Sequence, residues 1–392
     1  MSFGDNGGMT SASHSSAVAE PFEGLRIRGV AKTFGADTTV LNEIDLDVHP
    51  GELISLVGSS GTGKSTLLRI IAGLEEPSAG RVTYAGQPLE RGSVGVVFQR
   101  PILYPHLSVK DNILFPTRLG AFAGRVDMDY YRELLEALKL EGLESRKPSQ
   151  LSGGQAQRVG IARALIRRAP VVLFDEPLAS VDEEMSASIR ADIVRLHERY
   201  GFTGLYVTHD QNEALMLGQR VAVMDAGYLV QVDTPERLLA HPHTLQVAKL
   251  LAAPALNLLA LEDSEFLPTG CELAIRATAL CPVAAEAAHS LPVQVLGSRH
   301  LVGGMLYRAR LLEAVSLPLE SRRASADSEL SARMYARVRA GQELEFFIPD
   351  AQSATLSGAS PNSTFLGVGE RVHLGVAAER CFLFSEGKRF YL

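Results

Sequence analysis

Two hydrophobic patterns alternate along the chain and predict its secondary structure. Short continuous apolar runs are typical of strands that are buried on both faces of a parallel sheet. Apolar residues that recur every three or four positions indicate helices that cover such a sheet. This alternation predicts an α/β fold. Strand-like runs lie at residues 53–57, 171–176 and 204–210, and helical segments lie at residues 67–74 and 129–143.

A turn and helix at residues 151–165 contain no group that can act as a chemical catalyst. The sequence LSGGQAQRVGIARAL has no cysteine, histidine or acidic residue, so it offers no nucleophile, general base or metal ligand. Ile161 and Leu165 are expected on one buried face, and Arg158 and Arg163 are expected to face solvent. The residue types alone leave open whether this is an ordinary surface helix or a functional element.

A glycine-rich loop follows the first strand-like run. Residues 58–66, GSSGTGKST, stand between a strand and a helix, which is the context that a phosphate-binding loop requires. Gly58, Gly61 and Gly63 allow backbone N–H groups to turn toward phosphate oxygens at the positive end of the helix dipole. Lys64 is expected to reach the β- and γ-phosphates of a nucleotide, and Ser65 is expected to bind Mg²⁺.

Polar residues also end the other strand-like runs. Asp175 is placed to bind Mg²⁺, and Glu176, one residue later, is placed to polarise an attacking water. His209 ends the third run at the edge where ligands bind in α/β sheets, and there it could donate to a γ-phosphate. Gln99 ends a further strand and opens a helical insertion. Solvated turn acids and a structural histidine are the alternatives that these residues leave open.

The composition argues against nucleic acid as the main partner. The chain has 392 residues, enough for two domains, and a net charge of -7 with no dominant basic footprint. Its three cysteines, Cys271, Cys281 and Cys381, suit a reducing compartment. Residues 1–21 are expected to be a disordered tail without the features of a signal peptide. No apolar stretch is long enough to cross a bilayer, so we expect a cytoplasmic protein that contacts a membrane through a partner.

The order of the motifs resembles that of the ATP-binding subunits of ABC transporters. That family has a Walker A loop, a Q-loop, the signature LSGGQ, a Walker B strand, a D-loop and a switch histidine. The resemblance implies an ABC-type P-loop ATPase core at residues 22–243, with a helical insertion at about residues 100–160. In the same order, the motifs here are residues 58–66, Gln99, residues 151–155, residues 171–175, residues 179–182 and His209.

The resemblance also implies how ATP is held. The signature of one subunit would cap the γ-phosphate of ATP on the Walker A loop of another, with a hydroxyl and backbone N–H groups at a helix N-terminus. Residues 151–155 would then need no side-chain chemistry. Glu176, His209 and Gln99 would be catalytic, and Ser65, Gln99 and Asp175 would hold Mg²⁺. Phe34 would stack on adenine unless it is a core residue. The implied ATP-binding residues are Phe34, Gly58, Ser59, Ser60, Gly61, Thr62, Gly63, Lys64, Ser65, Thr66, Ser152, Gly153, Gly154, Gln155 and Asp182.

Further segments resemble the maltose/sugar-importer ATPase branch of the family. They are LYPHLSVKDNILF, YVTHDQNEAL and a long C-terminal extension. In that branch the extension is a small β-rich domain of the OB type with a regulatory role, which places this domain at residues 244–392. Alternating segments at residues 271–280, 304–315, 342–350 and 370–384 predict short strands there.

The resemblance implies an ATPase subunit that works as a head-to-tail dimer and drives solute import. The implied partners are a second ATPase subunit, expected to be an identical copy, the transmembrane permease subunits at whose cytoplasmic face it would sit, and indirectly a solute-binding protein. Carbohydrate, polyol or glycerol phosphate is the expected solute. For the solute, the alternatives are sulfate, ferric iron or a polyamine. For the partner, the alternative is a related second ATPase chain. A soluble ABC ATPase is a further alternative, although the long coiled-coil arms of those that act on DNA are missing between Walker A and the signature.

Overall fold

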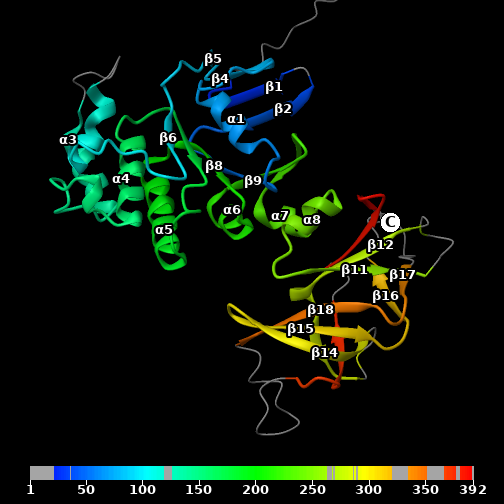
Figure 1. Cartoon of the computed structure of the whole chain (residues 1–392). Coiled ribbons are helices and arrows are strands. Elements are labelled where there is room, and N and C mark those ends of the chain that lie inside the picture. Colours follow the sequence, from blue (N-terminus) through cyan, green and yellow to red (C-terminus); the bar gives the residue numbers. More distant parts are fainter. Residues whose placement is uncertain are drawn as a thin grey trace, which may run out of the picture.

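The structure is a computed structural model that describes most of the chain (Figure 1). The described residues are 22–35, 37–118, 126–262, 267, 270–285, 287, 290–319, 334–350, 366–376 and 380–390. The tail predicted at residues 1–21 lies outside the described residues.

The first part of the chain begins with a four-stranded antiparallel sheet (Figure 1). Its strand order is β2-β1-β4-β5. Leu25, Ile27 and Val30 are buried in a core that also contains Leu67 and Leu68 of the first helix, because apolar side chains on one face of the sheet need such a cover. The strands are β1 (Leu25–Phe34), β2 (Thr38–Val48), β4 (Ala79–Tyr84) and β5 (Gln87–Pro88).

A six-stranded sheet forms the centre of this part. Its order is β10-β9-β3-β8-β7-β6, and every neighbouring pair is parallel except β10 and β9. The central strands are buried on both faces, as continuous apolar runs predict. In β7, Val172 and Phe174 join one core cluster, whereas Val171 and Leu173 join another. The strands are β3 (Leu53–Val57), β6 (Gly95–Val97), β7 (Val171–Asp175), β8 (Thr203–Thr208), β9 (Arg220–Asp225) and β10 (Tyr228–Asp233).

Helices cover the six-stranded sheet and form the predicted insertion between β6 and β7. In the segment predicted to be helical at residues 129–143, Leu134, Leu135 and Leu138 are all buried in the cluster that contains Phe174. The prediction of an α/β P-loop core with a helical insertion is therefore confirmed. Within the described ranges, no helix is long and apolar enough to cross a membrane. The helices are α1 (Lys64–Ile71), α2 (Val109–Leu114), α3 (Met128–Ala137), α4 (Gly153–Leu165), α5 (Glu183–Tyr200), α6 (Gln211–Leu217), α7 (Pro235–Ala240) and α8 (Leu245–Leu250), with 3-10 turns η1 (Phe115–Arg118) and η3 (Pro148–Gln150).

Two of the predicted strands end earlier than their apolar runs suggest. The second run stops being a strand at Asp175, because Glu176 has a left-handed backbone with φ 45°. The third run forms β8 only as far as Thr208, so His209 lies in the loop that follows. Both functional candidates at these positions therefore sit on turns rather than on strands.

The prediction that Arg158 and Arg163 face solvent is wrong. Nη1 of the half-buried Arg163 donates to the carbonyl of Ile102 (2.6 Å). Arg158 is buried on α4, and its Nη2 lies 2.8 Å from the carboxylate of Asp192 on α5. Arg195 pairs with the same carboxylate, which is fully buried. Ion pairs therefore join α4 to α5 inside the protein.

We expect Asp192→Asn to lower the free energy of unfolding by about 3 kcal/mol, because it leaves the buried Arg158 guanidinium without a counter-charge. Urea unfolding of the whole chain, followed by circular dichroism, measures this change. Asp129→Asn is the matched control, since Asp129 pairs with Arg132 on the surface, where such pairs contribute about 1 kcal/mol or less. Equal destabilisation by the two substitutions would contradict this role of Asp192.

The second part of the chain is rich in β-strands, as predicted, and has its own core (Figure 1). Its sheets have the orders β11-β12-β20-β21, β13-β19-β14-β15-β18 and β16-β17. The segment predicted as a strand at residues 271–280 turns into η4 (Ala277–Ala279), and the segment at residues 370–384 forms two strands. The strands are β11 (Leu256–Ala260), β12 (Glu272–Arg276), β13 (Cys281–Val283), β14 (Leu291–Leu301), β15 (Gly304–Leu311), β16 (Val315–Leu319), β17 (Met334–Val338), β18 (Glu343–Pro349), β19 (Arg371–Gly375), β20 (Cys381–Ser385) and β21 (Lys388–Phe390).

Helix α8 links the two parts. Val247 packs with Val57 and Val221 of the six-stranded sheet. The next residue, Ala248, joins a small apolar cluster with Phe382 of β20. The division between residues 243 and 244 therefore remains our proposal, with α8 as an element that both parts share.

Candidate functional site

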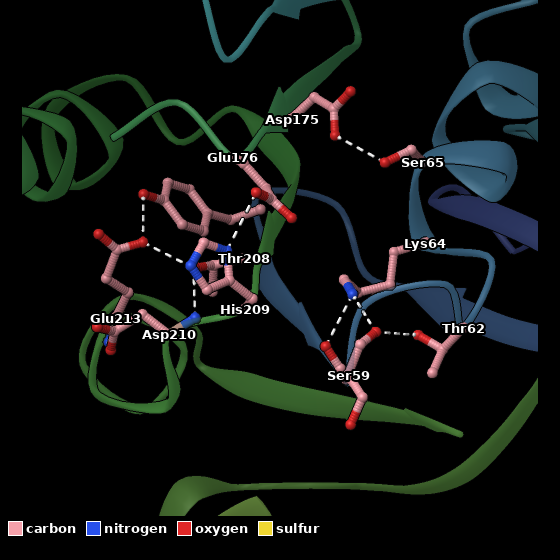
Figure 2. A network of polar contacts seen from close by, with 12 residues as sticks. Ser59, Thr62, Lys64, Ser65, Asp175, Glu176, Thr208, His209, Asp210 and Glu213 are labelled. Carbon is pink, nitrogen blue, oxygen red and sulfur yellow. Dashed lines mark hydrogen bonds and ion pairs between the residues drawn. The ribbon is translucent and has the colours of Figure 1, made fainter. Parts of the chain in front are cut away.

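The sheet topology brings three of the predicted motifs to one edge. Strands β3, β8 and β7 are parallel neighbours in that order, so their carboxyl ends lie side by side. The loop at residues 58–66 follows β3, His209 follows β8, and Glu176 follows β7. Figure 2 shows these side chains converging from the three strand ends. This edge is where ligands bind in open α/β sheets.

The loop at residues 58–66 is wrapped around the ammonium group of Lys64. Gly61 and Gly63 have φ angles of 81° and 98°, which side chains disfavour, so glycine is required for this path of the backbone. Lys64 Nζ donates to the carbonyls of Gly58 (2.7 Å) and Ser59 (2.8 Å). Burial lowers the pKa of Lys64, and the charges of Glu176 and Asp175 act in the opposite direction. The cation is therefore fixed at the centre of the loop.

Ser65 and Asp175 place two hard oxygen donors together. The Ser65 hydroxyl donates to Asp175 Oδ1 over 3.3 Å (Figure 2). Burial raises the pKa of Asp175, while the Ser65 hydrogen bond lowers it. No group of three or more His, Cys, Asp or Glu side chains suited to a metal occurs among the described residues. Mg²⁺ commonly uses one or two protein oxygens together with phosphates and waters, so this pair fits that ion.

Glu176 is turned toward His209 by its unusual backbone. Its left-handed φ of 45° is accompanied by a hydrogen bond from its N–H to the Val207 carbonyl (2.9 Å). Its carboxylate Oε2 lies 3.1 Å from His209 Nδ1 (Figure 2). Such a backbone costs energy and is typical of functional sites. The turn thus sets a carboxylate and an imidazole next to each other at the strand edge.

A hydrogen-bond network behind His209 was missed by reasoning from the sequence. Thr208 and Tyr206 donate from their hydroxyls to Glu213 Oε2 over 2.8 and 3.2 Å. Asp210 accepts from the backbone N–H groups of Asn212 and Glu213 and so caps α6. An aspartate before a helix is a recognisable capping signal, but the pairing of Glu213 with a strand has no local signal. The network holds the loop of His209 between β8 and α6.

The signature residues form the N-terminus of α4. Ser152 Oγ accepts from Gln155 N (3.3 Å), and Gln155 Oε1 accepts from Ser152 N (3.0 Å), which is a reciprocal capping box. Ser152 and Gly153 are exposed, whereas Gly154 is buried against Met185. Within the described residues, no hydrogen bond or ion pair joins residues 151–155 to residues 58–66. The exposed Ser152 and Gly153 are therefore accessible at the N-terminus of α4.

The other predicted site residues lie on the loops after β6 and β7, at the end of β1 and on the loop at residues 58–66. Gln99 was expected to end a strand, but β6 ends at Val97, so the exposed Gln99 lies in the loop that follows. Its carbonyl accepts from Ser180 Oγ (2.9 Å), which ties the Q-loop to the D-loop. Asp182 caps α5 by accepting from Met185 N (2.9 Å). Phe34 is 43% exposed, with the Lys32 ammonium 4.9 Å from its ring centroid, so it is not a core residue. Thr62 is buried, Thr66 is half-buried, and Ser60 is exposed on the loop.

The chain is similar to known ATP-binding proteins. A family model described as ABC transporter matches residues 41–179. The sn-glycerol-3-phosphate import ATP-binding protein UgpC 1 of Rhizobium johnstonii is 45% identical over 241 residues, which are 60% of this chain and 65% of that protein. UgpC of Yersinia enterocolitica is 45% identical over 243 residues, which are 60% of this chain and 67% of that protein.

One solved structure extends this similarity to the fold. The structure of cbiO1 from Clostridium perfringens, part of the ABC transporter complex cbiONQ, has a TM-score of 0.51 and 27% identity to this chain. The similarity covers 57% of this chain and 92% of that chain. The match to the curated relatives spans about two thirds of their length.

Proposed function

The chain belongs to the family of ABC transporter ATP-binding proteins, and we propose that it is the ATPase subunit of an importer of glycerol phosphate, a polyol or a carbohydrate. The observation that carries the ATPase role is the meeting of Lys64, His209 and Glu176 at the ends of three adjacent strands. The names of the relatives support glycerol phosphate as the solute. A sulfate, ferric iron or polyamine importer is the alternative.

In the proposed reaction, the backbone N–H groups of residues 58–66 and the Lys64 ammonium bind the ATP phosphates. Ser65 and Asp175 would hold Mg²⁺, which neutralises phosphate charge when it is bound, and Gln99 would complete this set from the Q-loop. Glu176 accepts a hydrogen bond from the attacking water and aligns it with the γ-phosphate. His209, held beside Glu176, donates to a γ-phosphate oxygen.

We further propose that the complete ATP site needs a second ATPase subunit. Ser152 and Gly153 are exposed at the N-terminus of α4, where N–H groups and the helix dipole favour an anion. Among the described residues they make no hydrogen bond to the loop of their own chain, and the γ-phosphate that they cap would belong to a partner. A head-to-tail dimer of identical chains meets this requirement, and a related second chain is the alternative.

The surface that would receive the permease lies beside the Q-loop. Residues 101–107 expose Ile102 and Tyr104, which are 64% and 39% exposed. The fully buried Asn112 fixes the backbone here by accepting from Tyr104 N (2.7 Å) and donating to the carbonyls of Tyr104 and Leu107. A groove of about 350 Å³ is lined by Arg163, whose guanidinium bonds the Ile102 carbonyl. An apolar loop on a fixed backbone suits a short helix of a permease at the cytoplasmic face of the membrane, which in turn would meet a solute-binding protein.

We expect Ile102→Asp to reduce solute uptake at least about tenfold while basal ATPase activity of the purified chain stays near wild type. A carboxylate in the middle of the apolar loop would disfavour docking of a permease helix without touching the nucleotide site. Uptake of labelled sn-glycerol 3-phosphate into cells that carry the permease measures the effect. Tyr104→Asp should act in the same way, although its ring also packs 4.4 Å from that of Phe115.

Val302→Asp is the matched control, because Val302 is fully exposed at the β14-β15 turn of the second part of the chain. It should leave both uptake and ATPase activity unchanged. Equal loss of basal ATPase activity in Ile102→Asp would show that the loop supports its own domain instead. If the cells take up labelled sulfate instead of sn-glycerol 3-phosphate, and Ile102→Asp abolishes that uptake, then the chain serves a sulfate importer.

A further inference from the structure

A pocket of about 660 Å³ lies where the two parts of the chain meet. One wall comes from α6 and α7 of the first part, and the other from β12, β20 and β21 of the second part. The nucleotide loop at residues 58–66 contributes nothing to its lining. Its volume is typical of sites for small organic ligands.

Three arginines of the second part line this pocket. They are Arg276, Arg380 and Arg389. Burial lowers the pKa of Arg276 to about 10, and the nearby positive charges of Arg389 and Arg380 add to this effect. Arg276 and Arg389 both lie against the ring of Phe382, at 5.1 and 4.6 Å from its centroid. Arg276 also donates to the Leu239 carbonyl (2.7 Å). Packing and backbone contacts thus hold like charges together, which costs energy unless an anion joins them.

The polar groups of the pocket are only partly satisfied. Within the described part of the chain, Nε and Nη2 of Arg276 are buried without a hydrogen-bond partner. The same holds for the side-chain oxygen of Gln211 on the opposite wall. Buried polar groups normally find partners, so a pocket with unpaired donors on one wall and an unpaired acceptor on the other is suited to a ligand. That ligand would accept at the arginine end and donate at the glutamine end.

The charge and shape of the pocket narrow the ligand class. Its lining residues include three guanidinium groups and a single carboxylate, that of Glu236. The lining therefore has a net positive charge, which suits a dianion. Leu215, Leu239 and Leu251 add apolar surface for a carbon skeleton. We propose that this pocket binds a hydroxylated phosphate monoester, such as a sugar phosphate, with its phosphate at the arginines and a hydroxyl at Gln211.

The site would connect the second part of the chain to the hydrolytic edge. Gln211 is the first residue of α6, which Asp210 caps immediately after His209. A ligand held between Arg276 and Gln211 therefore bridges the C-terminal strands and the helix that anchors the His209 loop. Binding would join the two parts more firmly, because it relieves the repulsion among the three arginines of the second part and adds hydrogen bonds across the boundary to Gln211.

Isothermal titration calorimetry on the full chain tests this site with glucose 6-phosphate, inorganic phosphate and glucose as probes, in the presence of saturating ADP. We expect glucose 6-phosphate to bind with a Kd of about 1 mM or tighter, inorganic phosphate to bind more weakly, and glucose not to bind. Arg276→Gln should weaken glucose 6-phosphate binding about tenfold. Gln211→Ala should weaken glucose 6-phosphate severalfold but leave inorganic phosphate unchanged.

Arg380→Gln is a second test in case Arg276→Gln does not fold. Because Arg380 is exposed, the Arg380→Gln protein should fold, and its affinity for glucose 6-phosphate should fall severalfold. Arg308→Gln is the matched control, since Arg308 is an exposed arginine of β15 that does not line the pocket. Equal affinity of the wild type, Arg276→Gln and Arg380→Gln would overturn the proposal. Failure of both phosphate probes to bind at millimolar concentration, or equal binding of glucose and glucose 6-phosphate, would do the same. Because binding is measured without ATP hydrolysis, these outcomes are independent of the ATPase proposal.

Discussion

Glu176→Gln should leave ATP binding nearly unchanged and abolish steady-state ATP hydrolysis. The amide keeps the size of the side chain, but it lacks the negative charge that polarises an attacking water. Loss of such a base costs about 10²- to 10⁴-fold in rate. The loop at residues 58–66 and Lys64 are retained, so the phosphates remain bound. Nucleotide affinity from a fluorescent analogue and phosphate release in the same preparation measure the two effects.

The control for this substitution is Glu183→Gln. Glu183 is an exposed acid in the first turn of α5, directly after the D-loop, and its replacement should leave turnover unchanged. Turnover of Glu176→Gln within a few-fold of the wild type would contradict the assignment. In that case the contact between Glu176 and His209 would be only structural.

Mixing Lys64→Ala with Gly153→Asp should restore an ATP-dependent closure that neither variant shows alone. If each site takes its Walker A loop from one chain and its signature from the other, each variant alone lacks a complete site. A mixed dimer regains one site, built from the intact loop of the Gly153→Asp chain and the intact signature of the Lys64→Ala chain. The carboxylate at residue 153 blocks the γ-phosphate by like-charge repulsion.

Gly153 is the better position for this substitution than the neighbouring Gly154. A Cβ at Gly154 would lie 2.5 Å from the Met185 side chain, so a substitution there would also disturb the packing of α4 on α5. A Cβ at Gly153 meets nothing within 4 Å. Gly153→Ala is therefore a control for side-chain bulk, and it should retain more closure than Gly153→Asp.

Closure is measured by cross-linking across the composite site with ATP and EDTA, which prevents hydrolysis. The fraction of cross-linked dimer in the mixture should match the fraction of mixed dimers expected from random assortment of the two chains. If mixed dimers are shown to form but close no better than either parent, the signature does not act on a partner chain. A wild-type level of closure by the Lys64→Ala chain alone would contradict the role of the loop.

Several features of the site follow from short stretches of sequence. Residues 53–74 contain a strand, a glycine loop and a helix in succession, and each depends on interactions between near neighbours. Asp175, Glu176 and His209 were recognised as groups at strand ends for the same reason, although the strands end one or two residues earlier than the apolar runs suggest. The β-rich character of the second part was also predictable, since alternation of side chains is a local property.

Other features depend on partners that are distant in the sequence. Arg158 was expected to face solvent. That prediction failed because the periodicity of apolar residues cannot reveal that Asp192 on α5 pairs with Arg158 inside the protein. The left-handed backbone of Glu176 occurs together with a hydrogen bond from its N–H to Val207 of the adjacent strand β8, and no residue next to Glu176 in the sequence signals this contact.

The amino-acid sequence by itself therefore determined the family, the order of the motifs and the chemical types of groups at the site, since these depend on residues that are neighbours in the chain. Only the tertiary structure decided which of those groups meet. Parallel pairing of β3, β8 and β7 set Lys64, His209 and Glu176 at one edge, and the packing of the second part on α6 placed Arg276 opposite Gln211. Such meetings depend on how whole elements pack, because a charged or polar side chain carries no local mark of the distant partner that it will face.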